Sequence, residues 1–431
     1  MKKRTVNIIT MGCSKNLVDS EVLLRQLERN RWHVAHDADG GSFDAVIINT
    51  CGFIHDAKQE SVDMILDYAD AKNKGDIGKL YVMGCLSERY KKELEIEIPE
   101  VDRYFGKFDL QSIAAELSAT YFPEYIYERK ITTPSHYAYL KISEGCNRHC
   151  AFCAIPGMTG KYHSRTMKSL EQEAKYLAAA GVKELLVIAQ DLSWYGFDLY
   201  GKSMLARLTD RLSEAEGIEW VRLHYFYPSQ FPMDILKVMR DNPKICKYLD
   251  IPLQHIADPV LKSMNRKVTR SQTEGLIREI RQAVPNVALR TTMLTGYPGE
   301  TREDFEALCR FVEEIRFERL GVFPYSHEEG TPSFARLEDD VPEEIKRERA
   351  DRLMEIQQQI SLEINESKIG ATLRVITDRR EGNRYVGRTQ YDSPEVDGEV
   401  LFASEKQINI GDFADVKITA AEEFDLLGNS V

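Results

Sequence analysis

Three cysteines lie close together in the middle of the 431-residue chain. They form a CxxxCxxC run, the central trio, in which Cys146 is followed by Cys150 and Cys153. Three thiolates on one short loop can bind three irons of a 4Fe–4S cluster and leave the fourth iron open to a small chelating molecule. A zinc site is the alternative, but zinc prefers four ligands in paired CxxC motifs, and the sequence has no second pair.

Three further cysteines each follow a predicted strand in the first part of the chain. Cys13, Cys51 and Cys85 form this N-terminal trio, without any short motif that joins them. Parallel strands end at the same edge of a sheet, so the three thiols are expected to converge there on a second three-thiolate cluster. Three buried structural cysteines are the alternative. The strands are expected at Val6–Met11, Ala45–Asn49 and Leu80–Met83.

The central run resembles the signature of the radical S-adenosylmethionine (SAM) superfamily, and the aromatic Phe152 before its last cysteine fits that pattern. The resemblance implies that the open iron binds SAM, that an electron cleaves SAM to methionine and a 5′-deoxyadenosyl radical, and that Phe152 lies near the adenine. Gln190 and Asp191 end a predicted barrel strand, where they are placed to contact SAM or the substrate. Turn chemistry or a helix cap is the alternative for both residues. No side chain is assigned to acid–base catalysis.

Hydrophobic patterns divide the chain into three expected domains, which together predict the α/β class. Strands alternate with helices in residues 1–125, which predicts a parallel-sheet domain. Six strand–helix repeats in residues 132–363 predict a closed or partly closed (β/α) barrel. Short strands between turn residues in residues 366–431 predict a small antiparallel β-barrel. The six central strands are expected at Tyr137–Ile142, Glu184–Ala189, Trp220–Tyr225, Tyr248–Pro252, Ala288–Thr292 and Leu320–Tyr325.

The bulk composition narrows the partners and the compartment. The formal net charge is −12, and a chain that grips nucleic acid usually carries a basic excess, so a basic partner is favoured. No apolar run is long enough to span a membrane, and the basic start of the chain has no signal-peptide core. A cytoplasmic protein is therefore expected, in which cysteines serve as metal ligands or packing residues more often than as disulfides.

The whole chain resembles the methylthiotransferase family, which joins a cluster-binding N-terminal domain, a radical SAM barrel and a C-terminal TRAM domain. The resemblance is close to the branch that modifies an aspartate of small-subunit ribosomal protein twelve. The tRNA-modifying branch typically carries Gln-Met-Asn after the first cysteine, where this chain has Ser14-Lys15-Asn16; the aspartate-modifying branch often has proline at the position of Ser14. The matching segments are Met11–Glu21, Asn49–Ile54, Tyr137–Asn147, Leu249–His255 and Glu423–Gly428.

The resemblance implies two 4Fe–4S clusters and a division of labour between them. The central trio would hold the SAM cluster, and the N-terminal trio an auxiliary cluster that carries sulfur to the β-carbon of the aspartate. SAM would serve both as radical precursor and as methyl donor. A sulfur donor and an electron donor are further implied partners.

The charge of the last domain gives a separate physical indication of the substrate. Residues 366–431 contain eight Lys and Arg against thirteen Asp and Glu. An acidic TRAM domain suits a basic ribosomal protein better than tRNA. The alternative is an acidic surface that is exposed to solvent and binds no partner. Two other functions stay open at this point: a tRNA adenosine methylthiotransferase, and a non-catalytic, zinc-stabilised module that binds ribosomes or RNA.

Overall fold

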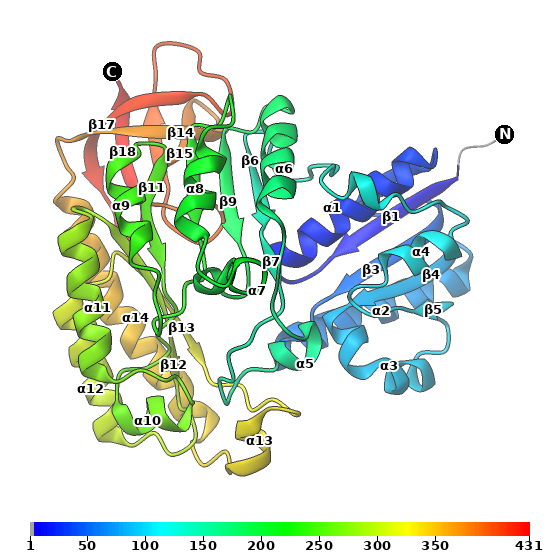
Figure 1. The fold of residues 1–431 in the computed structure, drawn as a ribbon, viewed down its shortest axis with the longest axis horizontal. Helices are drawn as coiled ribbons and strands as arrows, with labels where there is room; N and C mark the ends of the chain where they lie inside the picture. The colour runs from blue at the N-terminus through cyan, green and yellow to red at the C-terminus, as the bar shows by residue number, and fades with distance from the viewer. Residues whose placement is uncertain (1–3) are drawn as a thin grey trace.

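The computed structural model describes residues 4–431 and has three folded regions in chain order. Figure 1 shows the N-terminal region beside the central one, with the C-terminal strands packed on one end of the central region. None of the helices in the described residues combines the length and the apolar character needed to cross a bilayer. The arrangement confirms the predicted α/β class.

The N-terminal region is a five-stranded parallel sheet with the order β2-β1-β3-β4-β5. Alternate residues of its strands enter two separate cores: Ile8 and Ile47 face one, while Ile9 and Ile48 face the other. Helices α1 and α4 cover the first core, and α2 and α3 cover the second, as the two-sided burial of a parallel sheet requires. The elements are β1 (Thr5–Thr10), α1 (Ser14–Arg29), β2 (His33–His36), β3 (Phe43–Thr50), α2 (His55–Lys74), β4 (Ile77–Gly84), α3 (Cys85–Glu97), β5 (Arg103–Tyr104) and α4 (Leu110–Glu116).

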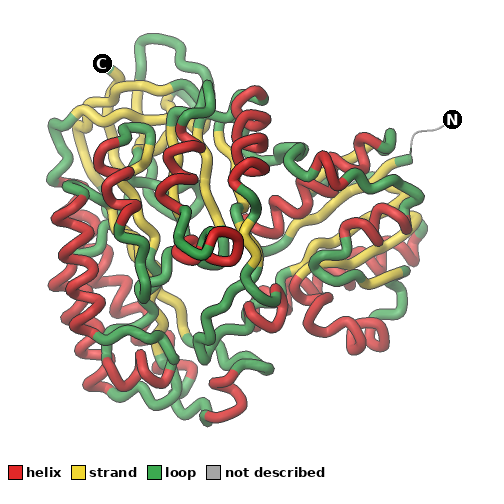
Figure 2. Tube along the Cα trace, viewed as in Figure 1, coloured by secondary structure: helices red, strands yellow, loops and turns green. Residues whose placement is uncertain are grey.

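The central region is a six-stranded parallel sheet with the order β13-β12-β11-β10-β9-β6, so it forms an open rather than a closed barrel. Figure 2 shows its helices on the outer side of the strands. All six strands overlap the predicted ones, and β6 and β13 are the two free edges. The strands are β6 (Tyr137–Lys141), β9 (Glu184–Ile188), β10 (Trp220–Leu223), β11 (Ile245–Asp250), β12 (Ala288–Thr295) and β13 (Arg319–Pro324). The longer helices are α6 (Met167–Ala179), α8 (Leu205–Ser213), α9 (Asp234–Asp241), α11 (Arg270–Ala283), α12 (Arg302–Ile315) and α14 (Glu343–Glu366).

Short elements line the loops between these strands and helices. Two of them, β7 and α5, flank the central trio, and η2 follows the second strand of the open barrel. They are η1 (Pro123–Tyr125), β7 (Ser143–Glu144), α5 (Ile155–Thr159), β8 (His163–Ser164), η2 (Leu192–Trp194), α7 (Phe197–Tyr200), α10 (Asp258–Ser263) and α13 (Pro332–Arg336).

The C-terminal region is a closed five-stranded barrel with the order β14-β15-β16-β18-β17. Inward residues such as Val375, Phe402 and Val416 form its core. The sequence pattern predicts four of the strands and misses β18, which pairs in parallel with β16. The predicted strands are Leu373–Ile376, Tyr385–Gly387, Glu399–Leu401 and Ala414–Ile418. The strands are β14 (Thr372–Glu381), β15 (Arg384–Thr389), β16 (Val400–Ala403), β17 (Phe413–Ala421) and β18 (Leu426–Ser430).

A buried ionic network joins this small barrel to the amino ends of the central strands. Glu184, at the start of β9, accepts hydrogen bonds of 2.8 Å from Arg222 and from Arg388. Arg388 also donates to Asp378, which lies 2.7 Å from His136. Burial opposes ionisation of Glu184, but the two arginines lower its pKa below the ordinary value of 4.5. The network therefore fixes the C-terminal barrel at the end of the central region opposite its carboxyl-end loops.

Candidate functional site

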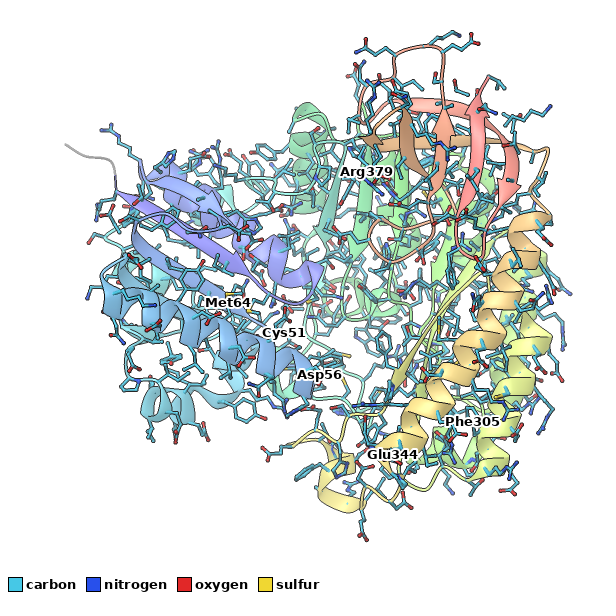
Figure 3. The ribbon with its side chains drawn as sticks, turned by 180° about the vertical axis from the view of Figure 1, so that it is seen from behind. Cys51, Asp56, Met64, Phe305, Glu344 and Arg379 are labelled. Atoms are coloured by element: carbon cyan, nitrogen blue, oxygen red, sulfur yellow. The ribbon has the colours of Figure 1, made fainter. Side chains whose placement is uncertain are left out.

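The N-terminal trio lies at the carboxyl ends of three adjacent parallel strands. Strands β1, β3 and β4 are neighbours in the sheet, and Thr50 at the end of β3 is opposite Gly84 at the end of β4. Cys13 precedes α1, Cys51 follows β3 directly, and Cys85 is the first residue of α3. Figure 3 shows Cys51 on the side of this domain that faces the central region. The fold thus brings the three cysteines to one edge, as the sequence predicts.

Two glycines allow the cysteine-bearing turns to touch. Gly12 has a φ of +84°, and a Cβ at this position would lie 2.8 Å from the Cys51 sulfur. A Cβ on Gly52 would lie 2.8 Å from the carbonyl carbon of Cys85. A larger residue at either position would push the turns apart. The glycines therefore belong to the packing that gathers the trio.

Burial affects the protonation of two thiols of the N-terminal trio. Burial raises the pKa of the Cys51 thiol, and it raises that of Cys85 to about 11 against the opposing effect of the Lys107 ammonium. Both of these thiols are therefore neutral at pH 7. Thiolate ligation to iron releases the proton, so iron binding and deprotonation are coupled at this edge.

The central trio lies on the loop between β7 and α5. Burial raises the pKa of Cys146 to about 11 and that of Cys153 to about 12. The Cys150 sulfur lies 3.4 Å from a guanidinium nitrogen of Arg266 and 3.7 Å from the hydroxyl of Tyr227. The loop therefore presents three thiols together with a cation and a phenol beside the middle one.

The two trios adjoin each other across the domain boundary. Cys85 shares a small buried apolar cluster with Ala154 and Met158, which follow Cys153 in the chain. Helix α3, which starts at Cys85, therefore packs directly on α5, which carries Met158. A group held by one trio would face the region of the other without an intervening domain.

The polar residues proposed from the sequence make hydrogen bonds within the protein. Gln190 donates to Glu144, whose pKa the Lys141 and Lys107 ammoniums lower to about 2 although burial opposes this. Asp191 accepts a hydrogen bond of 2.9 Å from the Ser193 backbone nitrogen and so caps the short helix η2. The helix cap that the sequence offers as the alternative for Asp191 is therefore present. Contact of Gln190 and Asp191 with SAM stays a prediction.

Asp191 and Phe152 both adjoin the central trio. Asp191 also accepts from Arg148 at 2.8 Å, and Arg148 lies between Cys146 and Cys150 in the loop. Phe152 lines the large cavity described below. The placement of Phe152 near adenine also stays a prediction.

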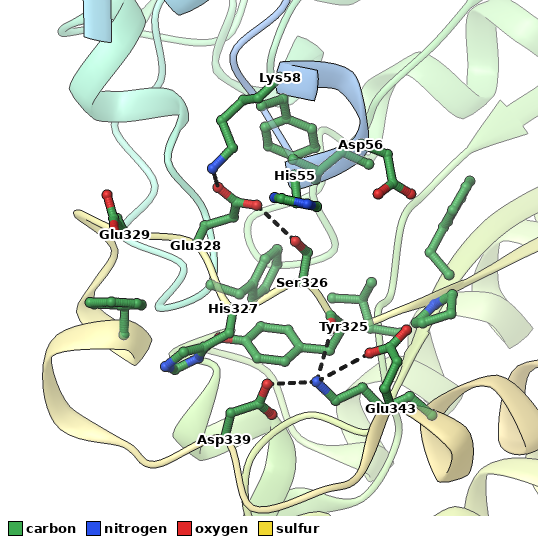
Figure 4. Close-up of a pocket in the computed structure, with 18 of the residues that line it drawn as sticks. His55, Asp56, Lys58, Tyr325, Ser326, His327, Glu328, Glu329, Asp339 and Glu343 are labelled. Atoms are coloured by element: carbon green, nitrogen blue, oxygen red, sulfur yellow. Dashed lines mark hydrogen bonds and ion pairs between the residues drawn. The ribbon is translucent and has the colours of Figure 1, made fainter. Parts of the chain in front are cut away.

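A cavity of 1190 Å³ lies between the N-terminal domain and the open side of the barrel. Figure 4 shows its wall, where Lys58 of α2 binds Glu328 at 2.7 Å and Ser326 donates to the same carboxylate. Arg89 of α3 reaches Glu328 at 3.3 Å, so two helices of the N-terminal domain converge on one buried acid of the central domain. The remaining wall includes Phe152 and residues of β12 and β13. The cavity is large enough for a SAM-sized ligand beside part of a macromolecular substrate.

The donor sets fit iron–sulfur clusters better than single ions. Within residues 4–431 no three His, Cys, Asp or Glu side chains are arranged as ligands of one metal ion. The thiolates of a 4Fe–4S cluster bind different iron atoms, so they stand farther apart than the ligands of one ion. The two sets of three cysteine thiols supply the type and number of donors that two 4Fe–4S clusters with one open iron each require.

Several residues of this site escape prediction from the sequence. Lys107, Tyr227 and Arg266 contact cysteine sulfurs, yet each lies far from its cysteine in the chain. Local motifs carry no signal for such contacts, because only the fold brings the segments together. Cys246 and Cys309, the two cysteines outside the trios, are buried in the core.

Three families match the chain in order. Residues 5–106 match the family described as Uncharacterized protein family UPF0004, residues 140–312 match the Radical SAM superfamily, and residues 369–431 match the TRAM domain. These matches correspond to the parallel sheet, the open barrel and the closed β-barrel.

Curated relatives match over the full length. The ribosomal protein uS12 methylthiotransferase RimO of Porphyromonas gingivalis is 54% identical over 100% of both chains. That of Bacteroides thetaiotaomicron is 53% identical over 99% of this chain and 98% of its own. Among solved structures, the radical SAM methyltransferase TsrM of Kitasatospora setae has a TM-score of 0.56 at 15% identity, covering 88% of this chain and 79% of its own. The last likeness shows the shared fold.

Proposed function

The chain belongs to the ribosomal protein uS12 methylthiotransferase family, and we propose that it adds a methylthio group to the β-carbon of an aspartate in uS12. It is a radical SAM enzyme that uses 4Fe–4S clusters and SAM. The observation that carries the methylthio transfer is the presence of two adjoining trios of thiols, and the choice of uS12 rests on the full-length likeness to uS12 methylthiotransferases. The domains are proposed to be residues 1–125, 132–363 and 366–431.

We propose that each trio holds one cluster. When bound, the cluster on the central trio supplies the radical that removes a hydrogen atom from an unactivated carbon, and that on the N-terminal trio supplies a site for sulfur. Arg266 would donate to the Cys150 thiolate and fix its orientation, while the nearby Tyr227 hydroxyl donates to the Arg266 carbonyl at 2.7 Å. Phe152, Gln190 and Asp191 are proposed to border SAM; the cavity supports this for Phe152, and the bond from Arg148 of the cysteine loop supports it for Asp191.

The cavity wall is proposed to keep water away from the reacting carbon. Glu328 is buried and is bound by Lys58 and Arg89, so this wall links the two cluster-bearing domains. A site that excludes water protects a radical from side reactions. SAM serves as radical precursor and methyl donor, while a sulfide source and a one-electron reductant complete the set of partners.

The acidic C-terminal barrel is proposed to contribute to recognition of uS12. The reaction is proposed to take place in the cytoplasm. Five of its thirteen acidic residues face the central region: Asp378, Glu395, Asp397, Asp412 and Asp392 bond to residues there. Within residues 4–431, the carboxylates of the other acids, including Glu422 and Glu423, make no such bond to the central region. Their charge complements a basic protein.

A product assay tests the proposed substrate. The anaerobically reconstituted, reduced enzyme is incubated with SAM and sulfide, and with either purified uS12 or unmodified tRNA. Mass spectrometry should find a methylthio group on one aspartate of uS12 and none on tRNA, and omission of SAM is the control. A methylthio adduct on a tRNA adenosine with unmodified uS12 would contradict the proposal and favour the tRNA-modifying alternative.

A further inference from the structure

Lys107 is a cation buried beside the N-terminal trio. It follows β5, its side chain is 3% exposed, and its ammonium donates to the Cys85 sulfur at 3.7 Å. The same ammonium donates at 3.3 Å to the amide oxygen of Asn16, whose own amide nitrogen binds the carbonyls of Met11 and Thr50. Lysine is rarely buried without a partner. Its place beside a cysteine sulfur therefore calls for a functional explanation.

The charges around Lys107 come from both cluster-bearing domains. Its ammonium lies 3.9 Å from the carboxylate of Asp19 in α1 and 3.9 Å from that of Glu144 in β7. Lys141 of β6 binds the same two carboxylates. The charges of the two lysines and the two carboxylates therefore balance while the cysteines are neutral. The Lys107 ammonium thus lies between the Cys85 sulfur and the Glu144 carboxylate, and Glu144 is two residues before Cys146 in the chain.

This balance changes when Cys85 becomes a thiolate. Three thiolates add negative charge at the N-terminal trio, and Lys107 is the cation whose contact with one of their sulfurs is direct. Hydrogen bonds to cysteine sulfurs and net local charge are among the factors that set the reduction potential of a 4Fe–4S cluster. A buried cation favours uptake of an electron nearby, because the reduced state is more negative by one charge.

Resting on the proposed function, in which the N-terminal trio holds the auxiliary cluster, we propose that Lys107 is a positioning residue for that cluster. Its ammonium donates to the Cys85 thiolate and stabilises the reduced state of the cluster. Through Asp19 and Glu144 it also joins the auxiliary site to the segment that leads into the central trio. The residue acts on the cluster and touches neither SAM nor the reacting carbon.

The test measures reduction potentials in the full-length holoenzyme. Lys107→Gln removes the charge, Lys107→Arg keeps it, and Lys79→Gln removes a cation of the same domain that is 58% exposed and bound to Asp102. Each reconstituted protein is titrated with dithionite and followed by electron paramagnetic resonance. The signal that does not change on addition of SAM is assigned to the auxiliary cluster.

We expect Lys107→Gln to lower the equilibrium constant for one-electron reduction of the auxiliary cluster at least tenfold, a shift of about 59 mV to more negative potential. Lys107→Arg and Lys79→Gln should stay near the wild-type value. A fully loaded Lys107→Gln protein with the wild-type potential, or an equal shift in Lys107→Arg, would overturn the inference.

Iron content gives a second readout that separates the two proposals. Loss of about four irons per chain in Lys107→Gln, with full iron in Lys107→Arg, would support a requirement for the charge. Equal loss in both variants would overturn it, because the shape of lysine would then matter and its charge would not. If the wild-type chain itself holds about four irons, the two-cluster proposal fails. If it holds about eight and only the potential is unmoved, the Lys107 inference alone fails.

Discussion

Selective removal of one cysteine trio separates the roles of the two sites. The variant Cys13→Ala/Cys51→Ala/Cys85→Ala deletes the thiols at the edge of the N-terminal sheet and leaves the central loop intact. Each trio occupies its own domain, so the variant should hold about four irons per chain where the wild type holds about eight. It should still cleave SAM to 5′-deoxyadenosine and should form no methylthio product.

The fold should survive this change. Cys51 and Cys85 are buried, and each substitution removes one sulfur atom, at a cost of about 1 kcal/mol per site. Cys13 is exposed and should cost less. A domain of about 150–250 residues loses roughly 2–4 °C of melting temperature per kcal/mol and a smaller one somewhat more, so the N-terminal domain of the metal-free variant should melt several degrees below that of the wild type.

The assay combines iron and protein quantitation, chromatography of 5′-deoxyadenosine and mass spectrometry of uS12. The matched control is Cys246→Ala/Cys309→Ala, which truncates two buried cysteines outside the trios and should retain about eight irons. The reciprocal variant Cys146→Ala/Cys150→Ala/Cys153→Ala should lose SAM cleavage. An N-terminal triple variant that keeps full iron and thiolates uS12 at the wild-type rate would refute the reasoning.

Three further predictions concern the contacts between domains. Arg388→Ala leaves Glu184 with one of its two buried arginines and should cost about 3–5 kcal/mol, whereas Arg379→Ala, 46% exposed, should cost under about 1 kcal/mol by thermal denaturation. Because the folded-state pKa of Glu184 lies below 4.5, its contribution to the free energy of unfolding is complete above that pH and is lost as the pH falls below it. The difference in melting temperature between the wild type and Arg388→Ala should therefore shrink below about pH 4. A difference that stays constant down to strong acid would contradict this. Glu328→Gln removes the negative charge held by Lys58 and should make the chain between the domains more accessible to limited proteolysis without loss of iron; an unchanged cleavage rate would argue against a role in holding the cavity wall.

The sequence predicts the architecture well because the strands are buried on both faces. Runs such as Val46–Ile48 and Leu185–Ile188 are apolar at every position, and this pattern is typical of parallel sheets. Their order along the chain also places the N-terminal trio at one edge. The short strands β2 and β5 of the N-terminal sheet and the strand β18, with its polar end, carry no such pattern and are missed.

The site is less predictable beyond its cysteines. The spacing of the central trio is a local signal, but Lys107 and Arg266 reach their sulfurs through the fold and through no motif. The acidic surplus of the last domain is visible in the sequence, yet the direction of each carboxylate is not. Asp378 and Asp392 turn inward because His136 and Arg319 of the central region lie opposite them.

The ionic contact between the C-terminal barrel and the central strands decides how deletion experiments can be read. A chain cut after α14 would expose Arg222 and Glu184 to water. Arg222 would also lose its hydrogen bonds to the carbonyls of Gln390 and Thr389. The remaining enzyme would then lose rigidity at the base of its barrel as well as the acidic surface that is proposed to recognise the substrate. Point substitutions on the outward acids, which leave this junction whole, are the cleaner way to ask what that domain recognises.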